Sequence, residues 1–220
     1  DQAPDPNYAN LVGWWKFDDA GNIGADSSSK GNNGITSGSS IRGGIDRCFN
    51  IPTTNDVMTI ERSSSSMPLH GNLTIAFWLK HVPPSGKKSY LMHSYCKNEM
   101  DVRISGNNIW FYHGDGTDYI GFKFENTYPS DGEWIHMTLV RDTSSKTICL
   151  YTNGTFKGSQ QYANAIAASS KPLGIGKIID GQMDDVRIYN KALSATEVAA
   201  LCNNQTPAEP YAAPTVQLSP

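Results

Sequence analysis

Apolar and polar residues alternate with a period of two along most of the chain, in short runs separated by polar turns. This alternation is typical of strands that bury one face. The dipeptide Asn153-Gly154 favours a type I′ hairpin turn, because both residues tolerate positive φ angles. The pattern predicts nine strands, at 11–17, 72–80, 90–95, 101–105, 108–113, 119–124, 133–141, 147–153 and 182–189.

One helix is predicted, in the segment LSATEVAALCNN that begins at Leu193. Ser194 can cap it, and Glu197 completes a capping box three residues later. Leu193 and Val198 occupy the positions of a hydrophobic staple around this cap. Nine or more strands with one short C-terminal helix indicate an all-β fold, an antiparallel β-sandwich of two sheets.

The alternation also assigns side chains to faces. The predicted core between the sheets comprises Leu73, Ile75, Phe77, Leu79, Ile135, Met137, Leu139, Ile148 and Leu150. The opposite faces carry Trp78, Trp134, His136, Cys149 and Tyr151. In the strand at 108–113 the pattern does not show which side points inward, that of Trp110 and Tyr112 or that of Ile109, Phe111 and His113.

Two adjacent aspartates lie in the last predicted strand. Alternation places Asp184 on the same face as Val186 and Ile188, and Asp185 on the opposite face with Arg187. A buried carboxylate without a partner is costly, so Asp184 is expected to be neutralised, hydrogen-bonded or metal-bound. Asp185 is expected to be an ordinary surface acid.

Charge and cysteine usage limit the classes of function. The 220 residues carry a formal net charge of −3 and no basic stripe, which argues against a nucleic-acid partner. The apolar runs are too short for a transmembrane segment, and any signal peptide is expected to have been removed or omitted. The scattered cysteines do not suit a zinc site, and in an extracellular protein they allow disulfides with three pairings open: Cys48, Cys96, Cys149 and Cys202.

The composition changes toward both ends of the chain. Residues 1–10 are interpreted as a polar lead-in to a domain at 11–202. Residues 203–220 contain four prolines and are interpreted as a linker toward a further domain. We therefore expect one module of a larger protein, with neighbouring domains of the same chain as partners.

Six blocks follow one another at suitable spacing: LVGWWKFDDAG, DSSSKGNNG, NLTIAFWLK, WIHMTLVRD, ICLYTNG and GQMDDVRIYNKALSATEVAAL. Together they resemble the laminin-G-like jelly-roll domains of the concanavalin A-like lectin/glucanase superfamily, over about residues 11–202. The resemblance implies two curved antiparallel sheets packed face to face, frequently with a structural calcium ion. It also implies a non-catalytic module of a secreted or cell-surface protein, often one that binds or acts on glycans. This fold hosts lectins, adhesion modules and enzymes, so it does not assign a function by itself.

The polar loop at 18–34 is rich in the oxygen ligands that calcium prefers. If the jelly roll closes as the resemblance implies, the first and last predicted strands are neighbours and Asp184 faces this loop. A structural calcium ion is then predicted, held by Asp26 and Asp184 and with Asp18 as a further candidate. The alternatives are that Asp184 accepts N–H groups of the loop without an ion, and that Asp18 only solvates a turn.

The acidic residues do not form the catalytic motifs of enzymes with related folds. Glycosidases of this fold type carry Glu-x-Asp-x-(x)-Glu, which places carboxylates on one face of a strand. The nearest approach is Glu99-Met-Asp101, which no second glutamate follows. His113 and Asp115 lie in YHGDGTDY, where a solvated hairpin turn is the simpler interpretation. The sequence predicts a protein that is not an enzyme.

Aromatic and planar polar side chains gather between residues 101 and 128. Sugar recognition uses aromatic rings that stack on sugar faces beside polar groups. The predicted ligand is a polysaccharide or other glycan, and the predicted ligand-binding residues are Arg103, Trp110, Tyr112, His113, Asp115 and Tyr119. The alternative is that the aromatic rings only cover the outer side of a sheet.

These observations favour a carbohydrate-binding module of a larger secreted or cell-surface protein. The rival interpretation is a protein-interaction or adhesion module, or an architectural spacer, without a glycan ligand. A degenerate glycan-active enzyme is a third class.

Overall fold

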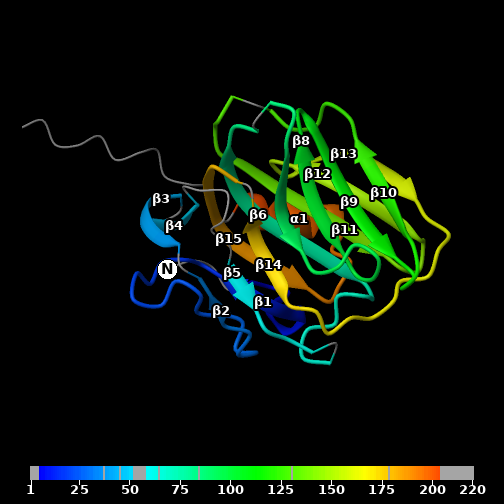
Figure 1. Cartoon of the computed structure of the whole chain (residues 1–220), viewed down its shortest axis with the longest axis horizontal. Coiled ribbons are helices and arrows are strands. Elements are labelled where there is room, and N and C mark those ends of the chain that lie inside the picture. Colours follow the sequence, from blue (N-terminus) through cyan, green and yellow to red (C-terminus); the bar gives the residue numbers. More distant parts are fainter. Residues whose placement is uncertain are drawn as a thin grey trace, which may run out of the picture.

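The structure is a computed structural model that describes residues 5–203 except 37, 45, 52–57, 64, 84, 130 and 178. In the described residues, two antiparallel sheets pack face to face around one core (Figure 1). Sheet A has the order β13 (Thr155–Gln161), β12 (Thr147–Thr152), β11 (Ile135–Asp142), β6 (Leu73–His81), β15 (Gly181–Tyr189), β4 (Asp46–Ile51) and β3 (Ser39–Gly43), and β1 (Leu11–Trp15) also pairs with β15. Sheet B has the order β10 (Tyr119–Phe124), β9 (Asn108–Gly114), β8 (Asp101–Ser105), β7 (Lys88–His93), β14 (Leu173–Lys177), β5 (Met58–Ile60) and β2 (Gly34–Ile35).

This architecture confirms the predicted all-β sandwich, and the first and last predicted strands are neighbours as the resemblance implied. The predicted core is also confirmed, because all nine of its side chains are buried between the sheets. Asn153 and Gly154 form the predicted turn between β12 and β13, with φ angles of 47° and 71°.

Six strands escaped the alternation pattern: β2, β3, β4, β5, β13 and β14. β13 is an edge strand with no buried residue, so its sequence carries no apolar period. β14 reads LGIGK, where Gly174 and Gly176 replace the side chains that would have shown the alternation. Edge strands and glycine-rich strands therefore need tertiary pairing to be recognised.

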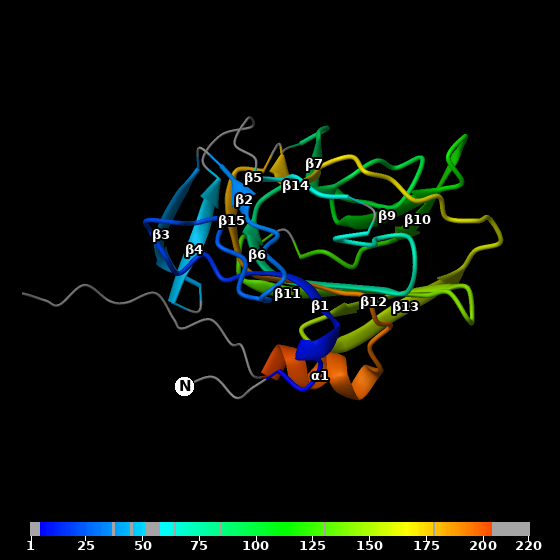
Figure 2. The ribbon, with the colours of Figure 1, turned by 90° about the horizontal axis from the view of Figure 1, so that it is seen from below.

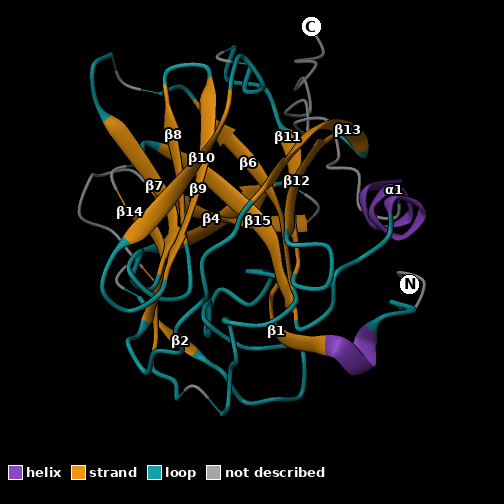
Figure 3. Cartoon of the chain, turned by 90° about the vertical axis from the view of Figure 1, so that its right-hand side faces the viewer, coloured by secondary structure: helices purple, strands orange, loops and turns teal. Residues whose placement is uncertain are grey.

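The predicted helix is α1 (Ala195–Asn203), and its capping box is confirmed. The Ser194 backbone N–H donates to the Glu197 carboxylate at 2.8 Å, and the Glu197 N–H donates to Ser194 Oγ at 3.3 Å. Val198 and Leu201 pack with side chains of the outer face of sheet A, among them Leu11, Ala76, Val140, Tyr151 and Tyr189. Figures 2 and 3 show α1 beyond sheet A, on the same side of the molecule as the 3₁₀ turn at Tyr8–Asn10. In the part of the chain that the structure describes, no helix could cross a membrane.

A β-bulge in β15 corrects the predicted faces of the two aspartates. Asp184 pairs with Trp78 and Arg187 with Ala76, so Asp185 and Val186 together oppose one residue of β6. Asp185 has a φ angle of +47°, and the extra residue reverses the alternation at this point. Asp184 therefore does not share the core face of Val186, and both aspartates lie on the outer side of sheet A.

Most of the predicted linker at 203–220 lies outside the described residues, as do residues 1–4 of the lead-in.

Candidate functional site

The outer face of sheet B is the candidate functional site. In the described residues α1 lies beyond sheet A and no helix covers this face (Figures 2 and 3). Strand β9 turns Ile109 and Phe111 into the core, and Trp110 and Tyr112 therefore point to the outer face. This settles the question that the alternation left open.

Five side chains cross this face in one row, alternating between cation and aromatic ring. The pairing register places Lys177 opposite Tyr90, Tyr90 opposite Arg103, Arg103 opposite Trp110, and Trp110 opposite Lys123. They come from β14, β7, β8, β9 and β10, which are neighbours in the sheet but not all consecutive in the chain. We call these five residues the cation–aromatic row.

Close ring contacts hold this row together. The Arg103 guanidinium lies 4.7 Å from the ring centroid of Tyr90 and 4.5 Å from that of Tyr112. The rings of Trp110 and Tyr112 are nearly parallel, 10° apart in orientation and 5.7 Å apart between centroids. Lys123 lies 5.8 Å from the Trp110 ring. Cation–π contacts of this kind stabilise the rings in fixed orientations.

A buried carboxylate anchors Arg103 in its position. The Arg103 Nη2 atom donates to Asp101 Oδ2 at 2.5 Å, and Asp101 is only 4% exposed. Burial raises the pKa of the Asp101 carboxyl, and the ion pair with Arg103 opposes this shift. The pair fixes the guanidinium between the two tyrosine rings.

A cavity of about 380 Å³ adjoins one end of the row. It lies over β5, β7 and β14, and its lining includes Thr59, His93, Lys171, Pro172, Gly174 and Lys177. Burial lowers the pKa of the His93 imidazole, and the neighbouring Asp101 opposes this shift. Lys177 belongs both to the cavity and to the cation–aromatic row, so the two features form one continuous surface.

Four of the six predicted ligand-binding residues come together on this face: Arg103, Trp110, Tyr112 and Tyr119. Tyr119 is 48% exposed, and its ring centroid lies 5.9 Å from that of Tyr112. The sequence analysis missed Tyr90, His93 and Lys177 because they join the site through pairing between distant segments. The sequence offered one signal for these three residues, the aromatic Tyr90 in the strand predicted at 90–95.

His113 and Asp115 do not join this site. The His113 imidazole is buried on the core side of β9, bonded to Asn164 at 3.1 Å and 4.6 Å from the Tyr162 ring. Burial lowers the pKa of His113 to about 4. Asp115 is exposed and accepts two turn N–H groups at 2.9 Å, which is the solvated turn of the simpler interpretation.

Asp26 organises its loop through hydrogen bonds. Its Oδ1 atom accepts the N–H groups of Trp14 and Ser28, both at 2.9 Å. Its Oδ2 atom accepts the Ser28 hydroxyl and the Asn32 N–H, both at 2.8 Å. Four donors thus point at the carboxylate on which the calcium prediction relied, and a cation would have to displace them.

Asp184 and Asp18 have other surroundings. Asp184 Oδ1 accepts the N–H of Asp185 at 2.7 Å, and its carboxylate lies against Gly44 of the turn between β3 and β4. Asp18 accepts the Arg47 N–H at 3.3 Å. Among the described residues, no three His, Cys, Asp or Glu side chains form a group that could hold a metal ion. These residues do not fit a shared calcium site in this geometry, and calcium stays a prediction from the sequence.

Asp185 is not a surface acid, because it is 4% exposed and lies in a buried network. Its Oδ1 atom accepts the Trp14 indole N–H at 2.5 Å and the Arg187 Nε–H at 3.1 Å. Arg187 also donates to Asp5 at 3.0 Å, and the Tyr189 hydroxyl donates to the same carboxylate at 2.6 Å. This network ties β15 to β1 and to the segment before it.

The carboxylates nearest to a glycosidase motif are structural. Glu99 is fully buried and pairs with the Arg62 guanidinium, and its backbone oxygen accepts Arg141 Nη1 at 2.7 Å. Asp101, two residues later, is bound to Arg103 on the outer face of sheet B.

All four cysteines are free thiols.

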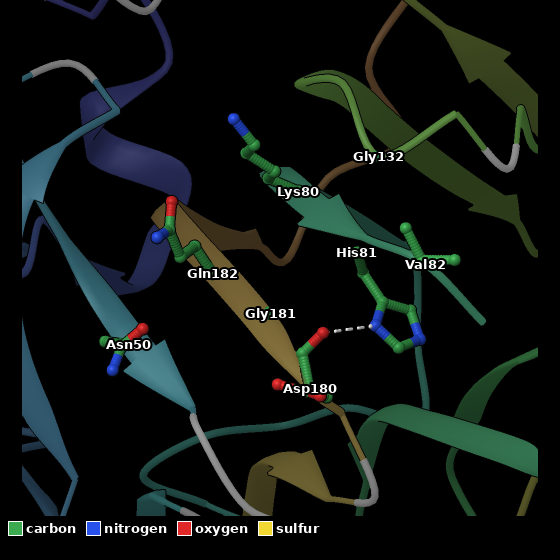
Figure 4. A pocket seen from close by; sticks show the side chains of 8 residues that line it. All are labelled: Asn50, Lys80, His81, Val82, Gly132, Asp180, Gly181 and Gln182. Carbon is green, nitrogen blue, oxygen red and sulfur yellow. Dashed lines mark hydrogen bonds between the residues drawn. The ribbon is translucent and has the colours of Figure 1, made fainter. Parts of the chain in front are cut away.

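A second hollow of about 380 Å³ lies at the end of β4, β6 and β15 (Figure 4). Asn50, Gln182 and Lys80 line it as neighbours across these strands. His81 Nδ1 lies 3.0 Å from the Asp180 backbone oxygen at its lower edge. Its described lining offers polar groups but no Trp, Tyr or Phe ring, so it lacks the stacking surface found on sheet B.

Solved structures share this fold. The binding domain of Paraclostridial Mosquitocidal Protein 1 matches at 18% identity with a TM-score of 0.74, over 89% of this chain and 52% of that chain. The receptor binding domain of botulinum neurotoxin mosaic serotype C/D matches at 16% identity and 0.74, over 90% and 52%. The binding domain of botulinum neurotoxin DC, solved in complex with rat synaptotagmin II, matches at 13% identity and 0.71, over 90% and 52%. The chain spans about half the length of these structures, and at such identities the likeness concerns the fold alone.

No curated protein matches the sequence. A sequence model of the laminin G type, described as "Concanavalin A-like lectin/glucanases superfamily", matches residues 52–199. This match spans more than half of the chain and agrees with the two-sheet sandwich described above. The chain therefore belongs to the concanavalin A-like lectin/glucanases superfamily.

Proposed function

We propose that this domain is a non-catalytic binding module that holds a carbohydrate on the outer face of sheet B. The observation that carries the proposal is the half-buried Trp110 ring, held nearly parallel to the buried Tyr112 ring on a sheet face that no described helix covers. Sugar rings stack on such aromatic faces, while neighbouring polar groups bind the sugar oxygens. Arg103 and Tyr119 supply polar groups beside the rings.

Membership of a superfamily named for lectins and glucanases supports a glycan as the ligand. The module is proposed to act within a larger secreted or cell-surface protein, beside neighbouring domains of its own chain. The structural Glu99 and the Arg103-bound Asp101 support a non-catalytic role, since neither is positioned as a free acid or nucleophile.

Two aromatic substitutions test the proposal against a matched control. Trp110→Ala and Tyr119→Ala remove rings from the site, and Phe156→Ala removes a ring from β13 in sheet A. Tyr119 and Phe156 are 48% and 53% exposed, so the two substitutions remove similarly accessible rings. A glycan array first identifies a ligand, and calorimetry then measures its affinity for each variant.

We expect each site variant to bind about fivefold more weakly, since aromatic contacts contribute on the order of 1 kcal/mol. Phe156→Ala should bind like the parent. If all three variants bound the glycan like the parent, or if all three lost the same affinity, the glycan would bind elsewhere. An array without any bound glycan would overturn the carbohydrate proposal.

A protein ligand is the second candidate, and the titles of the structural neighbours favour it. They are called binding or receptor binding domains, and one was solved with rat synaptotagmin II. The same variants distinguish the two candidates when the glycan array is repeated with a panel of cell-surface proteins. A protein hit that Trp110→Ala abolishes, without any glycan hit, would favour this candidate.

A further inference from the structure

The cavity beside the cation–aromatic row carries positive charge. Lys171 and Lys177 are both exposed residues of its lining, and His93, which pairs with Asp101 across β7 and β8, lines it as well. The described lining residues include no carboxylate. The whole chain has a net charge of −3, so this local excess of cations is not a property of the surface in general.

The other cations of the row are already paired. Arg103 is bound to Asp101 at 2.5 Å, and Lys123 is bound to Glu125 at 2.7 Å. No ion pair is formed by Lys171 or Lys177 with the described residues. The unpaired positive charge therefore lies at the β14 end of the row, and the rings of Trp110 and Tyr112 lie toward the other end.

A glycine makes room for the His93 imidazole in this cavity. A Cβ atom at position 174 would lie 2.7 Å from His93 Nε2, so only Gly174 leaves the imidazole its present place. Gly174 pairs with Thr59 on one side and with His93 on the other. A small group that enters here can therefore reach a hydroxyl, an imidazole and two ammonium groups.

We propose that this cavity binds the carboxylate or sulfate group of an acidic glycan whose next sugar units stack on the ring of Trp110. The inference rests on the proposed function and adds the class of glycan and its direction across the sheet. Charge complementarity favours an anionic group at Lys171 and Lys177 and a neutral ring at Trp110.

The distance between the two ends sets the size of the ligand. Lys177 on β14 and Trp110 on β9 are three strands apart, or about 14 Å at the usual spacing of strands. This length exceeds one sugar ring. The acidic group and the stacked ring therefore belong to different units of an oligosaccharide.

The test compares one oligosaccharide in two forms, as a hexuronate oligomer and after reduction of its carboxylates to alcohols. A sulfated oligosaccharide of the same length separates carboxylate from sulfate recognition, and sodium sulfate alone tests for a free anion. The variants are Lys171→Met and Lys177→Met. Lys157→Met, which removes an exposed lysine from β13 in sheet A, is the control with the same change in charge.

We expect the parent to bind an acidic form at least tenfold more tightly than the reduced form, with a preference that weakens as salt is added. In each cavity variant the ratio of the affinities for the acidic and the reduced form should fall about fivefold, since an accessible ion pair contributes up to about 1 kcal/mol. The quantity compared is the ratio of the affinities for the acidic and the reduced form, because this ratio separates recognition of the charge from stacking on the ring. Lys157→Met should leave both affinities unchanged.

Equal binding of the acidic and reduced forms would overturn this inference and leave the proposed function standing. Failure of every form to bind would overturn the proposed function itself. Sodium sulfate that binds as tightly as the oligosaccharides would also overturn the inference, because a free anion would then be the ligand.

Discussion

The same four residues, Asp-Val-Arg-Ile, occur once in each sheet, at 101–104 in β8 and at 185–188 in β15. In both places the arginine binds the aspartate two residues before it and lies over an aromatic ring. In β15 the pair is enclosed, with both side chains 4% exposed, and Asp5 adds a second carboxylate. In β8 the arginine side chain is 15% exposed on a face that no described helix covers.

The difference lies in what covers each tetrapeptide. Local sequence is sufficient to form the ion pair, because both residues point to the same side of a strand or of its bulge. The role of the pair depends on residues far away in the chain, such as Asp5 and Trp14 for Arg187. The covered pair ties β15 to β1 and to the segment before it, and the uncovered pair holds Arg103 between the rings of Tyr90 and Tyr112 on the proposed binding face.

Replacing the two arginines should show this contrast most strongly. Arg187→Met leaves Asp5 and Asp185 buried without a cation, and we expect a loss of about 3–5 kcal/mol in the free energy of unfolding. Arg103→Met leaves the buried Asp101 carboxylate without its cation, and a smaller loss of about 1–3 kcal/mol is expected, because one carboxylate is affected where Arg187→Met affects two; loss of glycan binding should accompany it. Denaturant unfolding measures both.

Should Arg187→Met fail to fold, Asp185→Asn weakens the same network less. Its loss in the free energy of unfolding should lie between those of the two arginine variants. If Arg187→Met and Arg103→Met lowered the free energy of unfolding equally, the residues that cover each ion pair would not determine its role.

The outer face of sheet A, which α1 covers, should also make the stability of the protein depend on pH. Burial lowers the pKa of His136 from 6.5 to about 3, and the Arg187 charge adds to this shift. Below pH 6.5 the unfolded chain therefore binds a proton that the folded protein does not, so stability falls as the pH falls toward 3. His136 contributes up to about 1.4 kcal/mol per pH unit in this range, and His136→Phe should make the slope shallower by that amount. Unfolding measured from pH 7 to about pH 4 gives the slope, and an unchanged slope would show that His136 is not held neutral.

Asp26 offers a smaller effect and tests the calcium prediction as well. Asp26→Asn replaces one carboxylate oxygen by an amide NH₂ group, which cannot accept the hydrogen bonds that the loop donates to Asp26. We therefore expect a loss of about 1–3 kcal/mol in the free energy of unfolding. Asp115→Asn is the control at an exposed turn. The hydrogen-bonded geometry predicts the same melting temperature with calcium and with a chelator. A rise with calcium that Asp26→Asn abolishes would mean that the loop rearranges around an ion.

The fold could be predicted wherever a strand has one apolar and one polar face. β6, β11 and β12 alternate cleanly between core and outer side chains, so the sandwich and its core follow from their sequences. β13 has no buried face, and β14 carries two glycines in five residues. The bulge at Asp185 was also invisible, because one extra residue leaves the composition of a strand unchanged.

The site could be predicted only in part, for a related reason. Arg103, Trp110 and Tyr119 lie on three strands that follow one another in the chain, so closeness in sequence indicated closeness in space. Lys177 and Tyr90 meet through the pairing of β14 with β7, across more than eighty residues of chain. His113 was included because the pattern of β9 did not show which face turns inward.

The finest test of the comparison concerns the ring over Arg103. A Cβ atom at Gly121 would lie 2.5 Å from Tyr112 Cε1, so Gly121→Ala should push this ring out of its stack with Trp110. We expect glycan affinity to fall about fivefold, or about 1 kcal/mol, with little change in stability, because the ring can move toward solvent. Gly71→Ala is the matched control, since a Cβ there meets nothing within 4 Å. Calorimetry with the array-identified glycan and a thermal melt measure the two quantities. A loss of stability without a loss of affinity would give Tyr112 the structural role that Trp14 has on the covered face.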